Sequence, residues 1–224
     1  MLNRQRTIEY LKLSENPSRA FKDETSFLIG ICHVQLGNFD QAQRFFEKSM
    51  DGMFNPITLW KGTGQVDWLV VVCILAGTTS LYPKVRQALD DYAQTKTTEN
   101  FYLYFANVVM ELLLPLGTDT AKLIEALLSK PKFKDTYTSG LVLQAILNHD
   151  QSNFTKALEQ LLKVHEGKAI HGELRSTPEG LLCMPAMALA YIAIKNKLKI
   201  EIENDYLSID YLDRITGSAP AKIN

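Results

Sequence analysis

Apolar residues recur in this chain with the period of an α-helix, and this pattern constrains the fold most. Between positions 101 and 112 one stripe at spacings i, i+3, i+4, i+7, i+8 and i+11 is formed by Phe101, Tyr104, Phe105, Val108, Val109 and Leu112. Such a stripe covers one face of a helix of about four turns. Leu and Ala together number 48 against 25 Val and Ile, a composition that favours helix over sheet. The sequence therefore predicts an all-α fold.

Short groups of Gly, Pro, Asn and Ser separate the periodic stretches and set the expected helix boundaries. The expected helices cover 17–36, 39–53, 66–77, 83–95, 99–114, 119–129, 137–148, 151–166 and 177–197, with a weaker one inside 3–14. The connections are mostly short, as in antiparallel helix pairs. We predict one domain over residues 1–224, with about nine or ten helices in stacked pairs and a frayed tail at 217–224.

The ninth helix carries the clearest boundary signals. The segment Ser176-Thr-Pro-Glu179 fits a capping box, and Pro178 suits a first helical turn. Pro185 lies within the same apolar stretch and predicts a kink near Leu181. After this helix, apolar and charged residues alternate over 198–203, which predicts a short extended segment, followed by a last helix near 209–215.

One segment is similar to a tetratricopeptide repeat (TPR). Gly30, Gly37, Phe39, Ala42 and Phe46 stand at spacings that this motif prefers, where small residues admit a neighbouring helix and aromatic rings fill the space between pairs. The Asn-Phe-x-x-Ala core at 38–42 returns at 153–157, 115 residues later, which is no multiple of the 34-residue repeat. We therefore expect a TPR-like α-α superhelix with degenerate units, not a regular array.

Four residues on these helices are expected to be buried in the core, namely Phe46, Phe105, Leu161 and Ala190.

Composition and motifs exclude several function classes. The net charge of −1 gives no basic excess for nucleic acid, and the longest uncharged apolar run, Leu181–Ile194, is too short for a membrane span. No secretion signal is visible at the N-terminus, and three Cys make no disulfide framework, so we expect a cytoplasmic protein. No metal-ligand spacing, nucleophile elbow or phosphate loop occurs. We expect no metal, no cofactor and no enzymatic activity; the oligomeric state is left open.

Two polar segments are candidate partner-binding surfaces. Residues 201–213 contain five acidic side chains and no basic one, and the candidates there are Glu201, Glu203, Asp205, Tyr206, Asp210 and Tyr211. The second segment precedes the ninth helix and offers His171, Glu173 and Arg175. The plainer interpretation is a solvated edge and a helix cap. The sharper one is an acidic, aromatic surface for a basic partner protein.

The last third of the chain contains a distinctive succession of four segments, Thr177-Pro-Glu-Gly-Leu-Leu182, Ala186-Met-Ala-Leu-Ala-Tyr-Ile-Ala193, Ile200-Glu-Ile-Glu-Asn-Asp-Tyr-Leu207 and Tyr211-Leu212. In these segments the chain resembles the bacterial immunity protein 49 family. Ser208 stands where a Pro is often found in that family, and the resemblance covers about 45 residues well.

The resemblance implies a protein of a polymorphic-toxin system that binds a cognate toxin domain and blocks it. Its implied partner is that toxin domain, without nucleic acid or membrane. A TPR-like scaffold or adaptor without a toxin partner is the alternative that the helical pattern leaves open.

Overall fold

The helical content of the fold follows the sequence pattern closely. A computed structural model describes residues 2–14, 22–54, 66–94 and 100–217. Within these ranges it contains eleven α-helices, two short 3₁₀ helices and no strand, so the all-α prediction is confirmed with slightly more helices than expected. The α-helices are α1 (Leu2–Ser14), α2 (Lys22–Gln35), α3 (Phe39–Met53), α5 (Val66–Leu75), α6 (Tyr82–Gln94), α7 (Phe101–Leu113), α8 (Thr120–Leu128), α9 (Lys134–Leu147), α10 (Gln151–His171), α11 (Met184–Lys195) and α12 (Ile209–Thr216). The 3₁₀ helices are η1 (Thr79–Leu81) and η2 (Pro178–Leu181).

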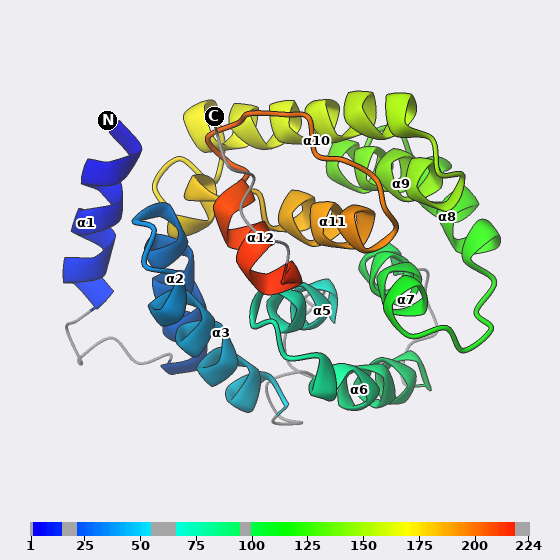
Figure 1. Ribbon diagram of the computed structural model, residues 1–224, viewed down its shortest axis with the longest axis horizontal. Coiled ribbons are helices and arrows are strands. Elements are labelled where there is room, and N and C mark those ends of the chain that lie inside the picture. Colours follow the sequence, from blue (N-terminus) through cyan, green and yellow to red (C-terminus); the bar gives the residue numbers. More distant parts are fainter. Residues whose placement is uncertain (1, 15–21, 55–65, 95–99, 218–224) are drawn as a thin grey trace.

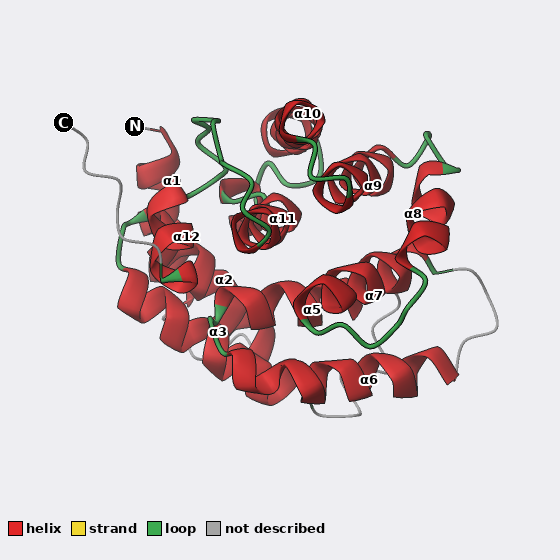
Figure 2. Cartoon of the chain, turned by 45° about the vertical axis from the view of Figure 1, so that its right-hand side comes forward, coloured by secondary structure: helices red, strands yellow, loops and turns green. Residues whose placement is uncertain are grey.

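The helices surround α11, which crosses the middle of the molecule (Figure 1). Helices α2, α3, α5, α6 and α7 lie along one side of it, and α9 and α10 lie along the other (Figure 2). Helices α5 and α11 are apolar on almost every face, and their residues are buried over Leu69–Leu75 and Ala186–Ala193. A helix that is apolar all round needs cover on all sides, which explains its central place.

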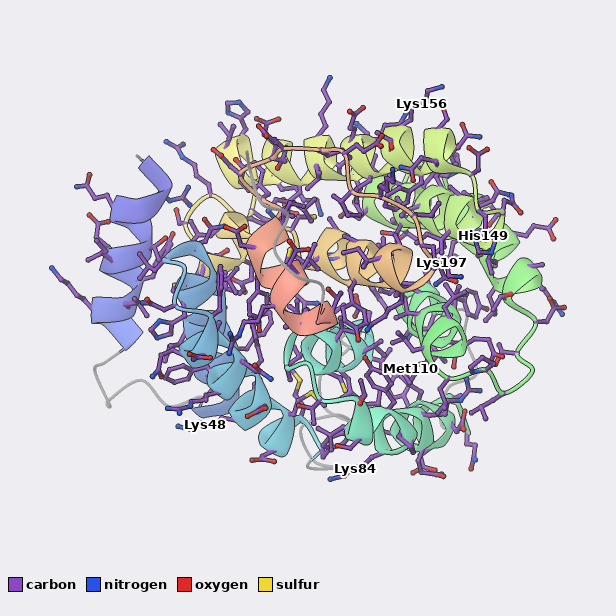
Figure 3. All side chains as sticks on the ribbon, in the orientation of Figure 1. Lys48, Lys84, Met110, His149, Lys156 and Lys197 are labelled. Carbon is purple, nitrogen blue, oxygen red and sulfur yellow. The ribbon has the colours of Figure 1, made fainter. Side chains whose placement is uncertain are left out.

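The core joins side chains from α2 to α12 in one cluster. Phe46 and Ala190 are fully buried, and Leu161 and Phe105 are 1% and 5% exposed, so the four predicted core positions are confirmed. Figure 3 shows the contrast between inside and outside: Met110 lies within the helices, while Lys48 and Lys156 project from the surface. In the described ranges no helix is both long and apolar enough to span a bilayer.

The residues of the TPR-like motif pack α2 against α3, with small residues where the two helices approach and an aromatic ring between them. A Cβ added at Gly30 would lie 2.7 Å from Cε1 of Phe46, so only glycine allows this ring between the helices. Gly37 forms the turn with φ +74°, a conformation that glycine adopts without strain. Ala42 is fully buried on the same face of α3. These contacts form the expected antiparallel pair.

Replacing Gly30 by alanine is expected to destabilise the fold by about 1–3 kcal/mol, because the new methyl group overlaps the Phe46 ring and forces the helices apart. Urea unfolding measures the change. Gly167→Ala is the matched control, since a Cβ at that helical position meets no atom within 4 Å. Equal midpoints for the two variants would contradict the close contact of α2 and α3.

The echo of this motif in the second half has a different register. Asn38 directly precedes α3, whereas Asn153 is the third residue of α10, whose N-cap is Asp150. Phe154, Ala157 and Leu161 are nevertheless buried, and α9 and α10 form a close antiparallel pair. The two motifs share a buried helix face, but they do not mark equivalent turns.

The prediction of one helix over 177–197 was wrong. The chain forms η2, becomes extended at Leu182 and Cys183, and begins α11 at Met184. Pro185 lies in the first turn of α11, where its missing N–H costs nothing, so it starts a helix and does not kink one. The capping box is also absent: the side chain of Thr177 caps no amide of η2.

The predicted alternation of apolar and charged residues after α11 is confirmed in the pattern of burial. Leu198 and Ile202 are buried while Lys199, Glu201 and Glu203 are exposed. The segment forms no strand, and the backbone bridge between Asn204 and Leu207 closes a turn before α12. Helix α12 ends at Thr216, and the predicted tail lies outside the described residues from 218 onward.

Candidate functional site

Four of the predicted acidic residues form an exposed set. We call Glu201, Glu203, Asp205 and Asp210 the acidic surface; all four side chains are exposed, and none has an ion pair within the described part of the chain. Burial and the nearby charge of Asp210 both raise the pKa of Asp213. The negative charge here is therefore not neutralised by basic side chains among the described residues.

The two tyrosines of this segment have different environments. Tyr211 is fully buried, and its hydroxyl donates a hydrogen bond to the Leu75 carbonyl at the end of α5. It therefore takes no part in the surface of the folded protein, contrary to the prediction. Tyr206 is half-buried, and its ring lies edge-on against His165 with the centroids 5.1 Å apart.

The second predicted segment begins inside a helix. Helix α10 extends to His171, five residues beyond its predicted end at 166, and the loop follows from Gly172. His171, Glu173 and Arg175 are all exposed. The Glu173 carboxylate lies 3.0 Å from Nζ of Lys168, which also pairs with Asp135 of α9.

Gln35 connects the region of η2 with the acidic surface. Its side-chain amide donates to the Leu181 carbonyl at 2.5 Å and to the Asp205 carbonyl at 3.2 Å. Asp205 and Asp210 line one shallow depression together with the end of α2. The structure thus brings these two acidic residues together, and Gln35 fixes the Asp205 backbone beside α2 and η2.

A pocket with mostly apolar walls, which sequence reasoning missed, lies between α5, α7, α9, α10 and η2. Its volume is about 220 Å³. Aromatic side chains of α5 and α7 line it together with the polar residues Asp67, His165, Lys168 and Glu179. These residues come from segments far apart in the sequence, so no local spacing could indicate the pocket.

Three polar atoms of the residues that line the pocket are shielded from solvent without a hydrogen-bond partner among the described residues: Oδ1 of Asp67, Nε2 of His165 and Oε2 of Glu179. Native structures leave few buried polar atoms unpaired, because each costs about 1–3 kcal/mol. The three atoms belong to residues that line one pocket, but the atoms themselves are covered by neighbouring groups and do not border its open space.

Burial shifts the protonation of the first two groups in opposite directions. It raises the pKa of Asp67 to about 7, against hydrogen bonds from the backbone amides of Asp67 and Trp68. It lowers the pKa of His165 to about 4, with Lys168 acting in the same direction and Asp135 and the Gly180 backbone opposing it. At neutral pH the imidazole is therefore uncharged.

Gly180 holds η2 beside this pocket. A Cβ at this position would lie 2.2 Å from the Leu174 carbonyl oxygen, so the loop after α10 packs directly against the glycine backbone. This contact fixes the turn that places Glu179 on the pocket wall. It also gives a physical reason for the Gly in the Thr177-Pro-Glu-Gly segment.

The pocket does not have the features of a nucleophile or metal centre. Cys183 lies on its wall, but burial raises the pKa of the thiol to about 12, which disfavours a thiolate. Among the described residues, no three His, Cys, Asp or Glu side chains are placed to hold a metal ion.

A wider groove of about 970 Å³ runs between α9 and α10 and adjoins the pocket. Tyr102, Asp135, Thr136 and Lys168 line both. Tyr102 and Phe133 are 52% and 59% exposed at this groove. Exposed aromatic side chains are frequent anchors in protein interfaces, and sequence patterns alone did not separate them from core aromatics.

A family model matches the part of the chain that contains most of the residues described above. The model of the family described as immunity protein 49 matches residues 85–207, which is 123 of the 224 residues and more than half of the chain. The chain belongs to the immunity protein 49 family. The matched part of this immunity protein 49 member extends from α6 to the turn before α12, and it includes His165, Glu179 and three residues of the acidic surface. No curated protein and no solved structure matches the chain.

Proposed function

We propose that this immunity protein binds the toxin domain of its own polymorphic-toxin system in the cytoplasm and blocks it by occupying its surface. The match to the immunity protein 49 family over residues 85–207 carries this proposal. Neutralisation in this mechanism is stoichiometric binding and needs no catalysis. Reactive groups are scarce in agreement with this, since burial raises the thiol pKa of Cys32, Cys73 and Cys183 alike.

The proposed contact is the acidic surface with Tyr206, extended by His171, Glu173 and Arg175. Four exposed carboxylates without ion pairs in the described residues support it, because unneutralised charge attracts a basic partner over a distance of about one Debye length, ~8 Å at physiological salt. A toxin that acts on nucleic acid presents basic side chains to it, and an acidic surface would cover them.

Protection and binding test the proposal together. The toxin domain encoded by the neighbouring gene is expressed with and without this protein, and complex formation is measured with the purified chains. We expect a 1:1 complex and restored growth. A toxin domain that neither binds nor loses its toxicity would contradict the proposed function.

Reversing two charges on the acidic surface is expected to slow association. Glu201→Lys with Asp205→Lys should lower the association rate at low ionic strength by at least about tenfold, within the 10–10³-fold range of electrostatic steering, and the loss should shrink as salt is added. Unfolding free energy should stay within about 0.5 kcal/mol, since both side chains are exposed.

The matched control makes the same charge change elsewhere. Glu125→Lys with Glu159→Lys alters exposed residues of α8 and α10 and should leave the association rate much closer to wild type. Wild-type binding and protection by the Glu201 and Asp205 variant would place the toxin on another surface.

A further inference from the structure

The groove between α9 and α10 has the dimensions of a short peptide. The two helices lie side by side (Figure 2), and residues from Gln160 to Gly172 of α10 line the groove. At about 1.5 Å per helical residue this stretch is about 18 Å long, a length that an extended chain covers with about five or six residues. Gly167 lies within it, and a Cβ there would meet no atom within 4 Å, so the space above the helix is open.

Two aromatic side chains line this groove although they are largely exposed. Phe133 and Tyr102 are 59% and 52% exposed. The Phe133 ring lies 6.2 Å, centroid to centroid, from Phe101, which packs against the core. The exposed ring is therefore held in one place, and large aromatic side chains held in this way are frequent anchors for a partner.

The groove also carries positive charge that the fold does not neutralise. Three of the lysines that line it are exposed and form no ion pair with a described residue: Lys132, Lys134 and Lys163. The fourth, Lys168, is paired with Asp135 and Glu173. Three ammonium groups therefore remain to attract negative charge into a groove with aromatic walls.

We propose that this groove binds a short acidic segment of a partner protein. Its carboxylates pair with Lys132, Lys134 and Lys163, and a large apolar side chain of the segment packs on Tyr102 and Phe133. None of the four residues of the acidic surface lines the groove, so this binding site is separate from the proposed contact with the toxin.

Two other occupants fit the groove less well. A nucleic-acid strand binds through clustered basic charge, whereas the whole chain has a net charge of −1. A second copy of this chain would offer Glu201 and Glu203, but Ile202 between them is buried. That segment is therefore held on its own helices and cannot lie in the groove of another molecule.

A library of random twelve-residue peptides displayed on phage is the first probe, selected on the full-length protein at low ionic strength. No toxin is present, so the result is independent of the proposed function. We expect the selected peptides to be enriched in Asp and Glu and to contain an aromatic or a large aliphatic residue. Selected peptides without an acidic excess, or no selection at all, would overturn the proposal.

The tightest selected peptide is then synthesised, and its binding is measured by fluorescence anisotropy. Lys132→Glu with Lys163→Glu should weaken binding by at least about tenfold at low salt, and the difference should shrink as salt is added. Lys48→Glu with Lys122→Glu makes the same charge change at exposed positions outside the groove and should bind like wild type. Equal losses in the two double variants would overturn the proposal, because they would show general attraction without a site.

Gly167→Leu tests the open space of the groove without changing its charge. Leucine is a better helix former than glycine, so the melting temperature should be no lower than that of wild type. The new side chain fills the groove and should weaken peptide binding by at least about tenfold, because the contact with the aromatic anchors is blocked. Gly167→Ala adds one methyl group and should bind far more tightly than Gly167→Leu. Undiminished binding by Gly167→Leu would contradict a peptide in this groove.

The two competing occupants are tested with the same variants. Binding of a twelve-nucleotide oligothymidylate as tight as that of the peptide, with the same loss in Lys132→Glu with Lys163→Glu, would show a general polyanion site and overturn the proposal. A wild-type dimer in sedimentation velocity that this double variant dissociates would assign the groove to a second copy, with the same consequence. We expect a monomer and much weaker binding of the oligonucleotide.

Discussion

Replacing Phe46 by alanine is expected to lower the free energy of unfolding by about 3–5 kcal/mol, the largest single effect that we expect from a side chain in this fold. The ring is fully buried between α2 and α3 and lies 6.1 Å, centroid to centroid, from both Phe27 and Tyr211. Its removal costs the transfer free energy of the ring and leaves a cavity. Urea unfolding at neutral pH gives the value directly.

Phe133→Ala is the control, since that ring is 59% exposed, and its loss should cost well under 1 kcal/mol. The Gly30 contact adds a second test: Gly30→Ala should cost less in the Phe46→Ala background, where the cavity accepts the new methyl group. A loss below about 1 kcal/mol for Phe46→Ala, or strict additivity with Gly30→Ala, would contradict the packing of this helix pair.

The second large expected effect is a pH dependence of stability, to which His165 and Asp67 contribute in opposite directions. His165 has its pKa lowered to about 4, below the 6.5 of an unfolded histidine. Protonation therefore favours the unfolded chain, and the stability that the neutral ring contributes is complete above pH 6.5 and is lost as the pH falls toward 4. Each pH unit in this window is worth up to about 1.4 kcal/mol.

Asp67 acts in the reverse sense. Its pKa is raised from 3.8 to about 7, so the folded protein keeps a proton that the unfolded chain releases. Its contribution is greatest below pH 3.8 and is lost as the pH rises through 7, again by up to about 1.4 kcal/mol for each pH unit. Between pH 4 and 6.5 the two dependences largely cancel in the wild-type protein.

Single variants should reveal each dependence. Relative to wild type, Asp67→Asn should gain stability as the pH rises from 4 to 7, and His165→Gln should gain stability as the pH falls from 6.5 to 4. Urea unfolding at four or five pH values measures both, with Glu203→Gln as an exposed control. Differences from wild type that do not change with pH would mean that neither group is buried in the protonation state described.

Sequence patterns predicted the helices well where one face is polar. The expected helix at 39–53 coincides with α3, whose Phe46 face is apolar and whose opposite face carries Asp40, Glu47 and Lys48. The stretch 181–194 is apolar on all sides and therefore carries no period that marks a break. For that reason the extended residues Leu182 and Cys183 and the start of α11 at Met184 were not predicted.

The surfaces were predicted less completely, because exposure depends on partners distant in the chain. The alternation over 198–203 correctly placed Glu201 and Glu203 outside. Tyr211 lies in an equally acidic segment, but it is buried, and its hydroxyl donates a hydrogen bond to the Leu75 carbonyl, 136 residues earlier in the chain. The pocket of Asp67, His165 and Glu179 depends in the same way on three separate segments that meet only in the fold.

The contact between Tyr211 and Leu75 has a consequence for how the chain acquires its structure. Helix α5 leaves the ribosome long before α11, which packs against it, and before Tyr211 of α12, which donates a hydrogen bond to Leu75. Until these C-terminal segments are synthesised, apolar surface of α5 is exposed in the nascent chain, which promotes aggregation and chaperone binding. Docking of the C-terminal residues is then a late step with a large loop to close, so folding of this helical protein should be slower than its helix content suggests.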